Sequence, residues 1–357
     1  MPGNALRQIT SATYPLVRCG LFALDPETAH HVSLRALKWV QDAPLASFDE
    51  RTFGPAKPVK VMGLTFPNRL GLAAGLDKGA QCVDGLGALG FGHIEVGTLT
   101  PRPQPGNPKP RLFRLKPAEA IINRMGFNNP GIDEAVQRLN QRVYPGVLGV
   151  NIGKNFDTPN EAAAEDYLKG LRAAYQTADY IAINLSSPNT KALRELQLVS
   201  QCRPLLKALI AERDRLADTH GNRVPLAIKI APDLEDSHVK ELADLFSDLQ
   251  LDAVIATNTT IDRSRVSKLT HAEETGGLSG GPVRERATEV ITILKNHLSN
   301  AMPIIGVGGI SSSCDALEKL QAGASLVQIY TGFVYHGSRL IDDILTTLDQ
   351  STSIDEV

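Results

Sequence analysis

The segment YIAINLSSPNT, residues 180–190, begins as an apolar run and ends in a series of polar and turn-forming residues. Asn184, Ser186, Ser187 and Asn189 bring amide and hydroxyl groups close together at the end of this run. A turn requires only one or two residues of this kind, so their number raises the alternative of a chemical site. Residues elsewhere in the chain decide between a loop and a site.

Asparagine recurs in several segments of the chain that are expected to form loops. Asn123, Asn184, Asn189 and Asn258 all fall in segments that should form loops at one face of the molecule. An asparagine side chain carries two donors and an acceptor, so several together can bind a planar ligand with amide and carbonyl edges. Each asparagine taken alone could instead form an Asx turn with its own backbone.

Lys229 lies inside the apolar run AIKIAPD, where a charged side chain must face the end of the strand or have a partner. A lysine in this position can form a Schiff base, as in an aldolase. It can also supply a fixed positive charge beside a group that becomes anionic, such as a reduced flavin. A structural salt bridge is the third alternative, and the lysine alone does not decide among them.

Three glycine-rich segments are expected near the ends of late strands: TGGLSGGP at 275–282, GVGGIS at 306–311 and YTG at 330–332. Glycine lets the backbone approach a ligand closely and tolerates positive φ. Loops after the last two strands of a TIM barrel often bind phosphate, so these segments favour a phosphate-bearing ligand. GLGALG at 85–90 matches the dinucleotide pattern but lies inside a crossover, so it predicts no dinucleotide site.

Eight short apolar runs alternate with segments whose apolar residues recur at helical spacing. The runs are LGLAAG (70–75), HIEVGT (93–98), GVLGVNIG (146–153), YIAINLSS (180–187), PLAIKIAPD (225–233), AVIATNT (253–259), PIIGVGGI (303–310) and LVQIYTG (326–332). Such strands are typical of parallel sheets covered on both faces, and eight strand–helix units predict an α/β fold of the (β/α)8 TIM-barrel type. Their carboxyl ends should meet on one face, where barrel active sites form. These ends are Gly75, Thr98, Asn151, Asn184, Lys229, Asn258, Gly309 and Tyr330.

Composition limits the kinds of partner. The 357 residues include 37 basic and 39 acidic ones, a formal net charge of −2, which gives a nucleic-acid partner no electrostatic support. The four cysteines lie far apart without a C-x-x-C pair, so we expect no metal site and a reducing compartment. The N-terminus lacks an apolar signal core and no run reaches ~18 apolar residues, so neither an export signal nor a membrane span is predicted.

Two segments lie outside the eightfold repeat. Residues 1–57 precede the barrel, and within them residues 21–44 predict two short helices separated at Asp25–Pro26. The second helix has a wide apolar arc, which could simply dock on the barrel. The other segment, residues 100–131, is a proline-rich insertion that contains NRMGFNN. A long loop with little secondary structure is usually functional, so we expect a lid or substrate loop there.

Ten motifs, in this order, resemble those of the class 2 (quinone-linked) dihydroorotate dehydrogenases. They are AAGLDK, GFGHIEVGTLTPRPQPGNPKPRLFRL, INRMGFNN, NIGKN, IAINLSSPNT, IKIAPD, IATNTT, TGGLSG, IIGVGGI and GASLVQIYTGF. The resemblance extends from about Tyr14 to the end of the last expected helix. It implies a bacterial enzyme that binds FMN, oxidises (S)-dihydroorotate to orotate in de novo pyrimidine (UMP) biosynthesis and passes the electrons to a membrane quinone.

The resemblance also implies which residues hold the flavin and the substrate. FMN would be bound by Ala74, Gly75, Leu76, Asp77, Lys78, Thr98, Asn151, Asn184, Lys229, Thr257, Gly280, Gly309, Tyr330 and Thr331. Dihydroorotate would be bound by Lys78, Asn123, Arg124, Met125, Gly126, Phe127, Asn184, Asn189, Asn258 and Thr259. The asparagines would then surround the pyrimidine ring, with Lys229 beside the flavin.

Ser187 would be the base that removes the C5 proton of dihydroorotate while a hydride leaves C6 for the flavin. A serine hydroxyl is a weak base near neutral pH, and no histidine or carboxylate lies in NLSSPNT. We therefore expect Thr190 or a bound water to relay the proton outward, along a route shaped by Phe127. The soluble class 1 enzymes place a cysteine in this role, and none of the four cysteines lies in such a loop.

For residues 1–57 the resemblance implies a helical segment that faces the membrane and admits the quinone tail. The FMN-binding TIM barrel would then span residues 58–357. Basic residues outnumber acidic ones up to residue 40, which slightly favours an anionic membrane surface. We expect peripheral attachment to the cytoplasmic side of the cell inner membrane.

Other functions fit parts of the pattern. A soluble dihydroorotate oxidase that uses fumarate or NAD would lack residues 1–57 and would use a cysteine base. A non-redox phosphate-binding barrel lyase would act through a Schiff base on Lys229. An inactive membrane-docking scaffold is disfavoured because the polar strand ends are intact.

Overall fold

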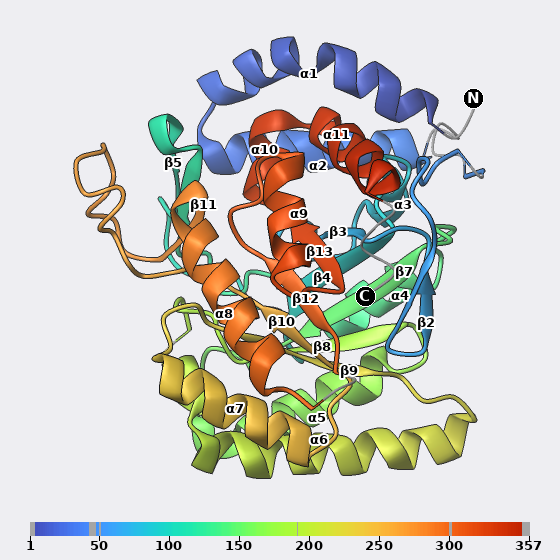
Figure 1. The fold of residues 1–357 in the computed structure, drawn as a ribbon, viewed down its shortest axis with the longest axis vertical. Coiled ribbons are helices and arrows are strands. Elements are labelled where there is room, and N and C mark those ends of the chain that lie inside the picture. The colour runs from blue at the N-terminus through green and yellow to red at the C-terminus, as the bar shows by residue number, and fades with distance from the viewer. Residues whose placement is uncertain (1–3, 43–47, 50, 191, 300–301, 352–357) are drawn as a thin grey trace.

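The computed structural model describes residues 4–42, 48–49, 51–190, 192–299 and 302–351. Its centre is a closed barrel of eight parallel strands, so the predicted (β/α)8 fold is confirmed (Figure 1). The strands are β3 (Leu70–Leu72), β4 (His93–Leu99), β7 (Val147–Ile152), β8 (Tyr180–Asn184), β9 (Leu226–Ile230), β10 (Ala253–Ala256), β12 (Ile304–Val307) and β13 (Leu326–Ile329). Their order around the barrel follows the chain, and β13 pairs with β3 to close it.

Helices surround the barrel and bury one side of each strand. They are α3 (Val83–Gly87), α4 (Ile132–Leu139), α5 (Ala163–Ala174), α6 (Val199–His220), α7 (Asp236–Asp248), α8 (Arg284–His297), α9 (Ser313–Gln321), α10 (Thr331–His336) and α11 (Ser338–Gln350). Short 3-10 turns are η1 (Lys116–Ala118), η2 (Asn160–Ala162), η3 (Leu193–Gln197) and η4 (Gly281–Val283). The main apolar core lies between strands and helices, which explains why the strands read as continuous apolar runs.

A short antiparallel hairpin packs against the barrel interior. It consists of β1 (Val59–Val61) and β2 (Leu64–Phe66). Val61 and Phe66 are buried among interior side chains of the barrel strands. The sequence pattern did not distinguish this hairpin from the start of the barrel.

The proline-rich insertion is not the largely unstructured loop that we expected. It contains β5 (Leu112–Leu115) and β6 (Ala120–Asn123), which pair antiparallel with each other. β6 pairs in turn with β11 (Gly277–Gly280), which lies within the glycine-rich segment TGGLSGGP. Apolar side chains of the three strands form a small core of their own, so the segment is a three-stranded sheet.

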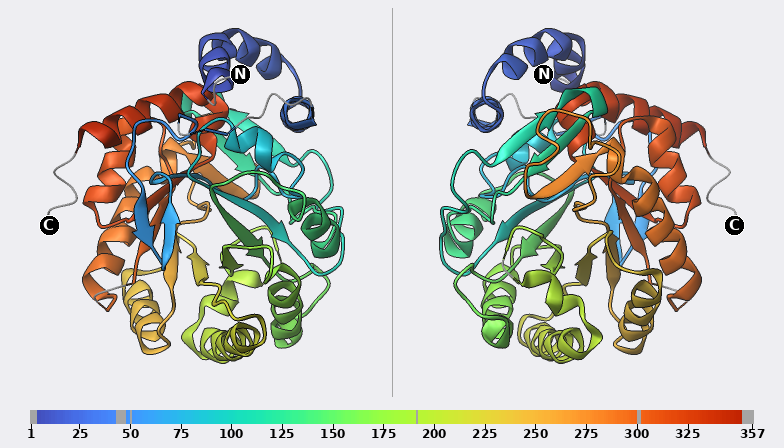
Figure 2. Two further views of the ribbon diagram at one scale, coloured as in Figure 1. Left: turned by 90° about the vertical axis from the view of Figure 1, so that its right-hand side faces the viewer. Right: turned by 90° about the vertical axis from the view of Figure 1, so that its left-hand side faces the viewer.

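The first two helices form a separate layer beside the barrel, which we call the hood. They are α1 (Ala5–Ala23) and α2 (Pro26–Asp42), so the predicted break at Asp25–Pro26 is confirmed, although the first helix is longer than expected. Figure 2 shows both helices outside the ring of barrel helices. Residues 1–3, 43–47 and 50 of the predicted segment 1–57 lie outside the described residues.

Side-chain contacts attach the hood to the barrel. The Tyr14 hydroxyl donates to the carbonyl of Val334 at 2.7 Å, and Arg7 forms an ion pair with Asp342 at 2.7 Å. A Cβ on Gly85 would lie 2.4 Å from the carbonyl oxygen of Leu37, so this glycine allows α2 to approach α3 closely. The first glycine of GLGALG therefore serves close packing of two helices.

Candidate active site

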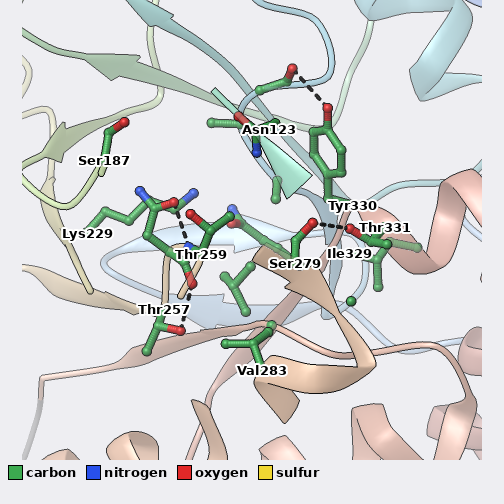
Figure 3. A pocket seen from close by; sticks show the side chains of 18 of the residues that line it. Asn123, Ser187, Lys229, Thr257, Thr259, Ser279, Val283, Ile329, Tyr330 and Thr331 are labelled. Carbon is green, nitrogen blue, oxygen red and sulfur yellow. Dashed lines mark hydrogen bonds between the residues drawn. The ribbon is translucent and has the colours of Figure 1, made fainter. Parts of the chain in front are cut away.

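A cavity of about 140 Å³ lies at the carboxyl ends of the barrel strands. Seven of the eight predicted strand ends line it: Gly75, Thr98, Asn184, Lys229, Asn258, Gly309 and Tyr330. Figure 3 shows Ser187 at one end of the group and Ser279 with Thr331 at the other. The cavity therefore separates the proposed proton acceptor from the glycine-rich segments expected to hold phosphate.

Lys229 enters the cavity from β9, and its ammonium lies 3.3 Å from the carboxylate of Glu95 on β4. Both side chains are buried. The Glu95 carboxylate also accepts hydrogen bonds from Asn151 at 2.8 Å, and from Tyr180 and Gln328 at 3.0 Å each. Burial by itself would raise the pKa of Glu95, but the charge of Lys229 and these hydrogen bonds lower it. Lys229 therefore has a salt-bridge partner and also faces the cavity.

Amides and hydroxyls form a network beside this ion pair. Thr98 Oγ1 donates to Asn151 Oδ1 at 2.6 Å and accepts from Asn184 Nδ2 at 2.8 Å. Asn258 Nδ2 donates to Ser186 Oγ at 2.9 Å and lies 3.4 Å from Asn184 Oδ1. These bonds fix which end of each amide donates and which accepts. A fixed set of this kind suits a planar ligand with amide and carbonyl edges.

Ser187 follows β8, lines the cavity and is buried. Its Oγ accepts from the N–H of Asn189 at 3.2 Å, and Asn189 Nδ2 donates to Asn123 Oδ1 at 3.3 Å. Thr190 Oγ1 is buried and has no hydrogen-bond partner among the described residues. An unpartnered hydroxyl close in sequence to Ser187 supports the relay that the sequence suggested, and Phe127 lines the same cavity.

The opposite end of the cavity is formed by glycine-rich backbone. Gly309 has a φ of 74°, and a Cβ there would lie 2.4 Å from the Cβ of Arg284. Gly280 has a φ of 94°, and a Cβ there would lie 2.3 Å from the carbonyl oxygen of Glu119. The Thr331 hydroxyl donates to Ser279 Oγ at 2.8 Å. Only glycine fits these two positions, so the backbone itself is presented to the cavity.

A second cavity of about 270 Å³ lies between the hood and the barrel and is mainly apolar. Its walls include Leu21, Ala29 and Leu37 of the hood and Phe333 of α10. Tyr330 lines both cavities, and burial raises the pKa of its hydroxyl to about 12, so the side chain stays neutral. One aromatic ring thus lies at the boundary between a polar site and an apolar one.

Comparison with known proteins identifies the family. The family model described as dihydroorotate dehydrogenase matches residues 57–351. The chain belongs to the dihydroorotate dehydrogenase family. A relative from Burkholderia cenocepacia named "Dihydroorotate dehydrogenase (quinone)" is 55% identical over 344 residues, which are 96% of this chain and 99% of that protein. One of the same name from Methylobacillus flagellatus is 54% identical over 335 residues, covering 94% of this chain and 99% of that protein.

Solved structures agree with this assignment. A DHODH from Eimeria tenella, crystallised with ferulenol, superposes with a TM-score of 0.84 at 39% identity over 93% of both chains. Its ligand-free form superposes with a TM-score of 0.83 at 40% identity, over 92% of this chain and 96% of that one. The dihydroorotate dehydrogenases are flavin-dependent oxidoreductases, so the barrel cavity must be judged as a flavin and substrate site.

Most of the residues predicted to bind the flavin or the substrate, or to remove the proton, line the barrel cavity of this member of the dihydroorotate dehydrogenase family. They are Ala74, Gly75, Lys78, Thr98, Asn123, Met125, Gly126, Phe127, Asn184, Ser187, Asn189, Lys229, Thr257, Asn258, Thr259, Gly280, Gly309, Tyr330 and Thr331. Lys78 donates to the carbonyl of Gly75 at 2.6 Å, and burial lowers the pKa of this lysine to about 8.

Four predicted residues do not line that cavity. Asn151 is held behind it by Glu95, and Leu76 lines the apolar cavity instead. The Asp77 carboxylate accepts backbone N–H groups at positions 81 and 82, so it fixes its own loop. The Arg124 guanidinium pairs with Glu274 at 2.6 Å and donates to the carbonyl of Pro110 at 2.8 Å.

Sequence reasoning missed Glu95, Ser279 and Gln328. Ser279 and Gln328 line the cavity, and Glu95 is the partner of Lys229. The signal for Glu95 was present, because a carboxylate inside the apolar run HIEVGT needs a partner as much as a lysine does. Ser279 and Gln328 carry a weaker signal, because a neutral polar side chain costs less to bury within a strand than a charged one.

Proposed function

We propose that this chain oxidises (S)-dihydroorotate to orotate and reduces a membrane quinone, a step of de novo pyrimidine biosynthesis. The observation that carries the proposal is a pair of cavities that share Tyr330 as a wall residue. One is lined by amides, hydroxyls and a lysine, and the other is mainly apolar. The names of these relatives, each covered to 99% of its length, support quinone as the acceptor. A fumarate- or NAD-linked oxidase or a lyase would have no use for an apolar cavity under the hood.

We assign FMN as the flavin. Gln328 Oε1 is buried in the wall of the barrel cavity without a partner among the described residues, which suits a ligand that donates a hydrogen bond. The glycine backbone at 280 and 309 and the hydroxyls of Ser279 and Thr331 suit a phosphate, while Lys229 places a positive charge in the cavity. When bound, the flavin supplies the hydride acceptor and the electron carrier.

The asparagine network would orient the pyrimidine ring. Asn123, Asn184, Asn189 and Asn258 line one cavity, and their amides are held by one another and by neighbouring hydroxyls. Ser187 would take the C5 proton of dihydroorotate, since its hydroxyl lines the same cavity and no histidine does so among the described residues. Burial of the site excludes bulk water, so the proton must leave through neighbouring hydroxyls such as Thr190.

The hood would bring the quinone to the barrel. Large apolar side chains remain exposed on it, with Leu16 80% and Trp39 65% exposed. Arg18 and Arg35 add positive charge, which suits an anionic lipid surface. Among the described residues no helix is long and apolar enough to cross a bilayer. We assign peripheral attachment to the cytoplasmic side of the cell inner membrane, with residues 1–57 as the attachment segment and residues 58–357 as the barrel domain.

A cavity-filling substitution tests this assignment. Ser33 lines the apolar cavity from α2, so Ser33→Trp should raise the KM for a short-chain quinone and leave reduction of the flavin by dihydroorotate unchanged. Lys38→Trp is the matched control, because Lys38 is exposed on the same helix and does not line the cavity.

Steady-state turnover should be measured with dihydroorotate and each of quinone, fumarate and NAD as the acceptor. Activity with quinone that Ser33→Trp impairs, and none with the other two, supports the two-cavity function. Equal activity with fumarate or NAD, or equal effects of the two tryptophan variants, would remove the role given to the hood.

A further inference from the structure

A buried ion pair joins the hood to the insertion. Glu27, in the first turn of α2, is 4% exposed and accepts from Arg111 Nε at 3.2 Å and from Arg111 Nη2 at 2.8 Å. Arg111, immediately before β5, is 7% exposed. Lys109 Nζ lies 3.3 Å from the same carboxylate. Burial by itself would raise the pKa of Glu27, but hydrogen bonds and charge from Arg111 and Lys109 lower it to about 2, so the carboxylate is ionised.

The third nitrogen of Arg111 holds a loop of the insertion. Nη1 donates to the carbonyl oxygens of Pro105 and Asn107, at 2.7 Å each. One guanidinium therefore contacts the hood and the loop 105–107 at the same time. A lysine could not reproduce this fork, because its ammonium is a single point of charge.

Asn107 connects this loop to the run predicted to bind the pyrimidine. Its N–H donates to the carbonyl of Met125 at 3.1 Å, and its Nδ2 donates to the carbonyl of Arg124 at 2.9 Å. A Cβ on Gly126 would lie 2.8 Å from Asn107 Cγ, so the run packs directly on this side chain. The position of Asn107 thus determines where residues 124–126 can lie.

The same amide also reaches the segment that carries the proposed base. Asn107 Nδ2 lies 3.3 Å from the carbonyl oxygen of Asn189, whose own N–H donates to Ser187 Oγ. A continuous series of contacts therefore runs from Glu27 through Arg111 and Asn107 to both walls of the substrate region. The helix that carries Glu27, α2, also lines the apolar cavity through Ala29 and its neighbours.

We propose that Glu27 and Arg111 are positioning residues for the reaction with dihydroorotate. They hold the loop 105–107 against residues 124–126 and Asn189, so the seating of α2 sets the affinity of the barrel for its pyrimidine. The hood then serves both half-reactions rather than the quinone alone. This inference rests on the proposed placement of dihydroorotate at the barrel mouth.

The experiment uses the full-length holoenzyme and isolates one half-reaction. Anaerobic rapid mixing with dihydroorotate, without quinone, gives an apparent Kd and a limiting rate from the loss of flavin absorbance. Glu27→Gln keeps the shape but removes the charge, and it should raise this Kd roughly fivefold or more with a smaller change in the limiting rate. Asp42→Asn is the matched control, because it breaks the exposed Lys38–Asp42 pair on the same helix.

One further variant keeps the test decisive if Glu27→Gln folds poorly, and a double-mutant cycle tests the coupling if it folds well. Arg111→Lys retains the positive charge but cannot reach Glu27 and both carbonyls together, so it too should raise the Kd. Glu27→Gln and Asn107→Ala should be non-additive in a double-mutant cycle although Glu27 and Asn107 share only Arg111 as a partner.

The outcomes separate the two levels of inference. Asn123→Ala must raise the Kd for dihydroorotate; if it does not, the placement of the substrate is wrong. If Asn123→Ala raises it while Glu27→Gln and Arg111→Lys change only thermal stability or the KM for quinone, the ion pair merely fastens the hood. Additivity in the cycle would likewise overturn the proposed coupling.

Discussion

Glu95→Gln tests whether the buried carboxylate controls the charge of the flavin site. The substitution preserves the size of the side chain but removes the charge that faces Lys229 at 3.3 Å. Coulomb's law at that distance and an effective dielectric constant of 20 gives about 5 kcal/mol. Breaking a buried ion pair by removing one partner typically costs about 3–5 kcal/mol, so we expect a loss of that order in the free energy of unfolding. The NH2 of the glutamine amide would also face donors in either orientation. It would face Tyr180 and Gln328, which donate to Oε2, or Asn151 and Lys229, which donate to Oε1.

The flavin should report the same change independently of stability. With its counter-charge removed, Lys229 exerts more positive potential on the cavity, which favours the anionic reduced flavin and raises its midpoint potential. Denaturant titration and potentiometric titration of the holoenzyme measure the two effects. Glu134→Gln is the control for an exposed pair with Arg138 and should change stability by at most about 1 kcal/mol. A wild-type denaturation midpoint together with a wild-type flavin potential in Glu95→Gln would refute the reasoning.

Three further outcomes follow from single residues. Ser187→Ala should retain bound flavin but slow its reduction by dihydroorotate by about 10²–10⁴-fold in rapid mixing, and fast reduction would exclude Ser187 as the base. Burial lowers the pKa of Lys78 to about 8, so the KM for dihydroorotate should rise as the pH passes above 8, and Lys78→Arg should abolish that rise. Burial also lowers the pKa of His93 to about 4 from its usual value near 6.5. As the pH falls, this histidine is therefore protonated in the unfolded chain at a higher pH than in the folded protein. Stability should therefore fall by about 3 kcal/mol between pH 6.5 and pH 4, and denaturant titrations of His93→Phe should lack that part of the slope.

Local sequence patterns determined the barrel and most of its mouth. A run such as YIAINLSSPNT combines an apolar strand with a polar end, and both properties belong to a few consecutive residues. Parallel closure then brings such ends together, which is why Asn184, Lys229 and Tyr330 line one cavity as predicted. The break at Asp25–Pro26 was equally local, because proline at a first helical turn is a property of the chain itself.

The insertion shows where this reasoning failed. β6 finds its second partner in β11, more than 150 residues later in the chain, and the sequence of β11, GLSG, does not identify a strand by itself. Strand pairing at such a separation depends on the fold that brings the two segments together. The expected loop is therefore a sheet, and its glycine-rich partner is a strand.

Side-chain direction was decided only by the tertiary structure. Leu76, Asp77 and Arg124 lie within motifs that the sequence assigned correctly to the mouth region, yet packing turns their side chains to other partners. Tyr330 lines two cavities because α1 and α2 cover one side of it, and Glu27 meets Arg111 because the hood contacts β5. The sequence alone determined which chemical groups gather at the barrel mouth, since strand patterns are local. The tertiary structure decided which of them face the ligand and which join the two sites, because those directions depend on contacts between residues far apart in the chain.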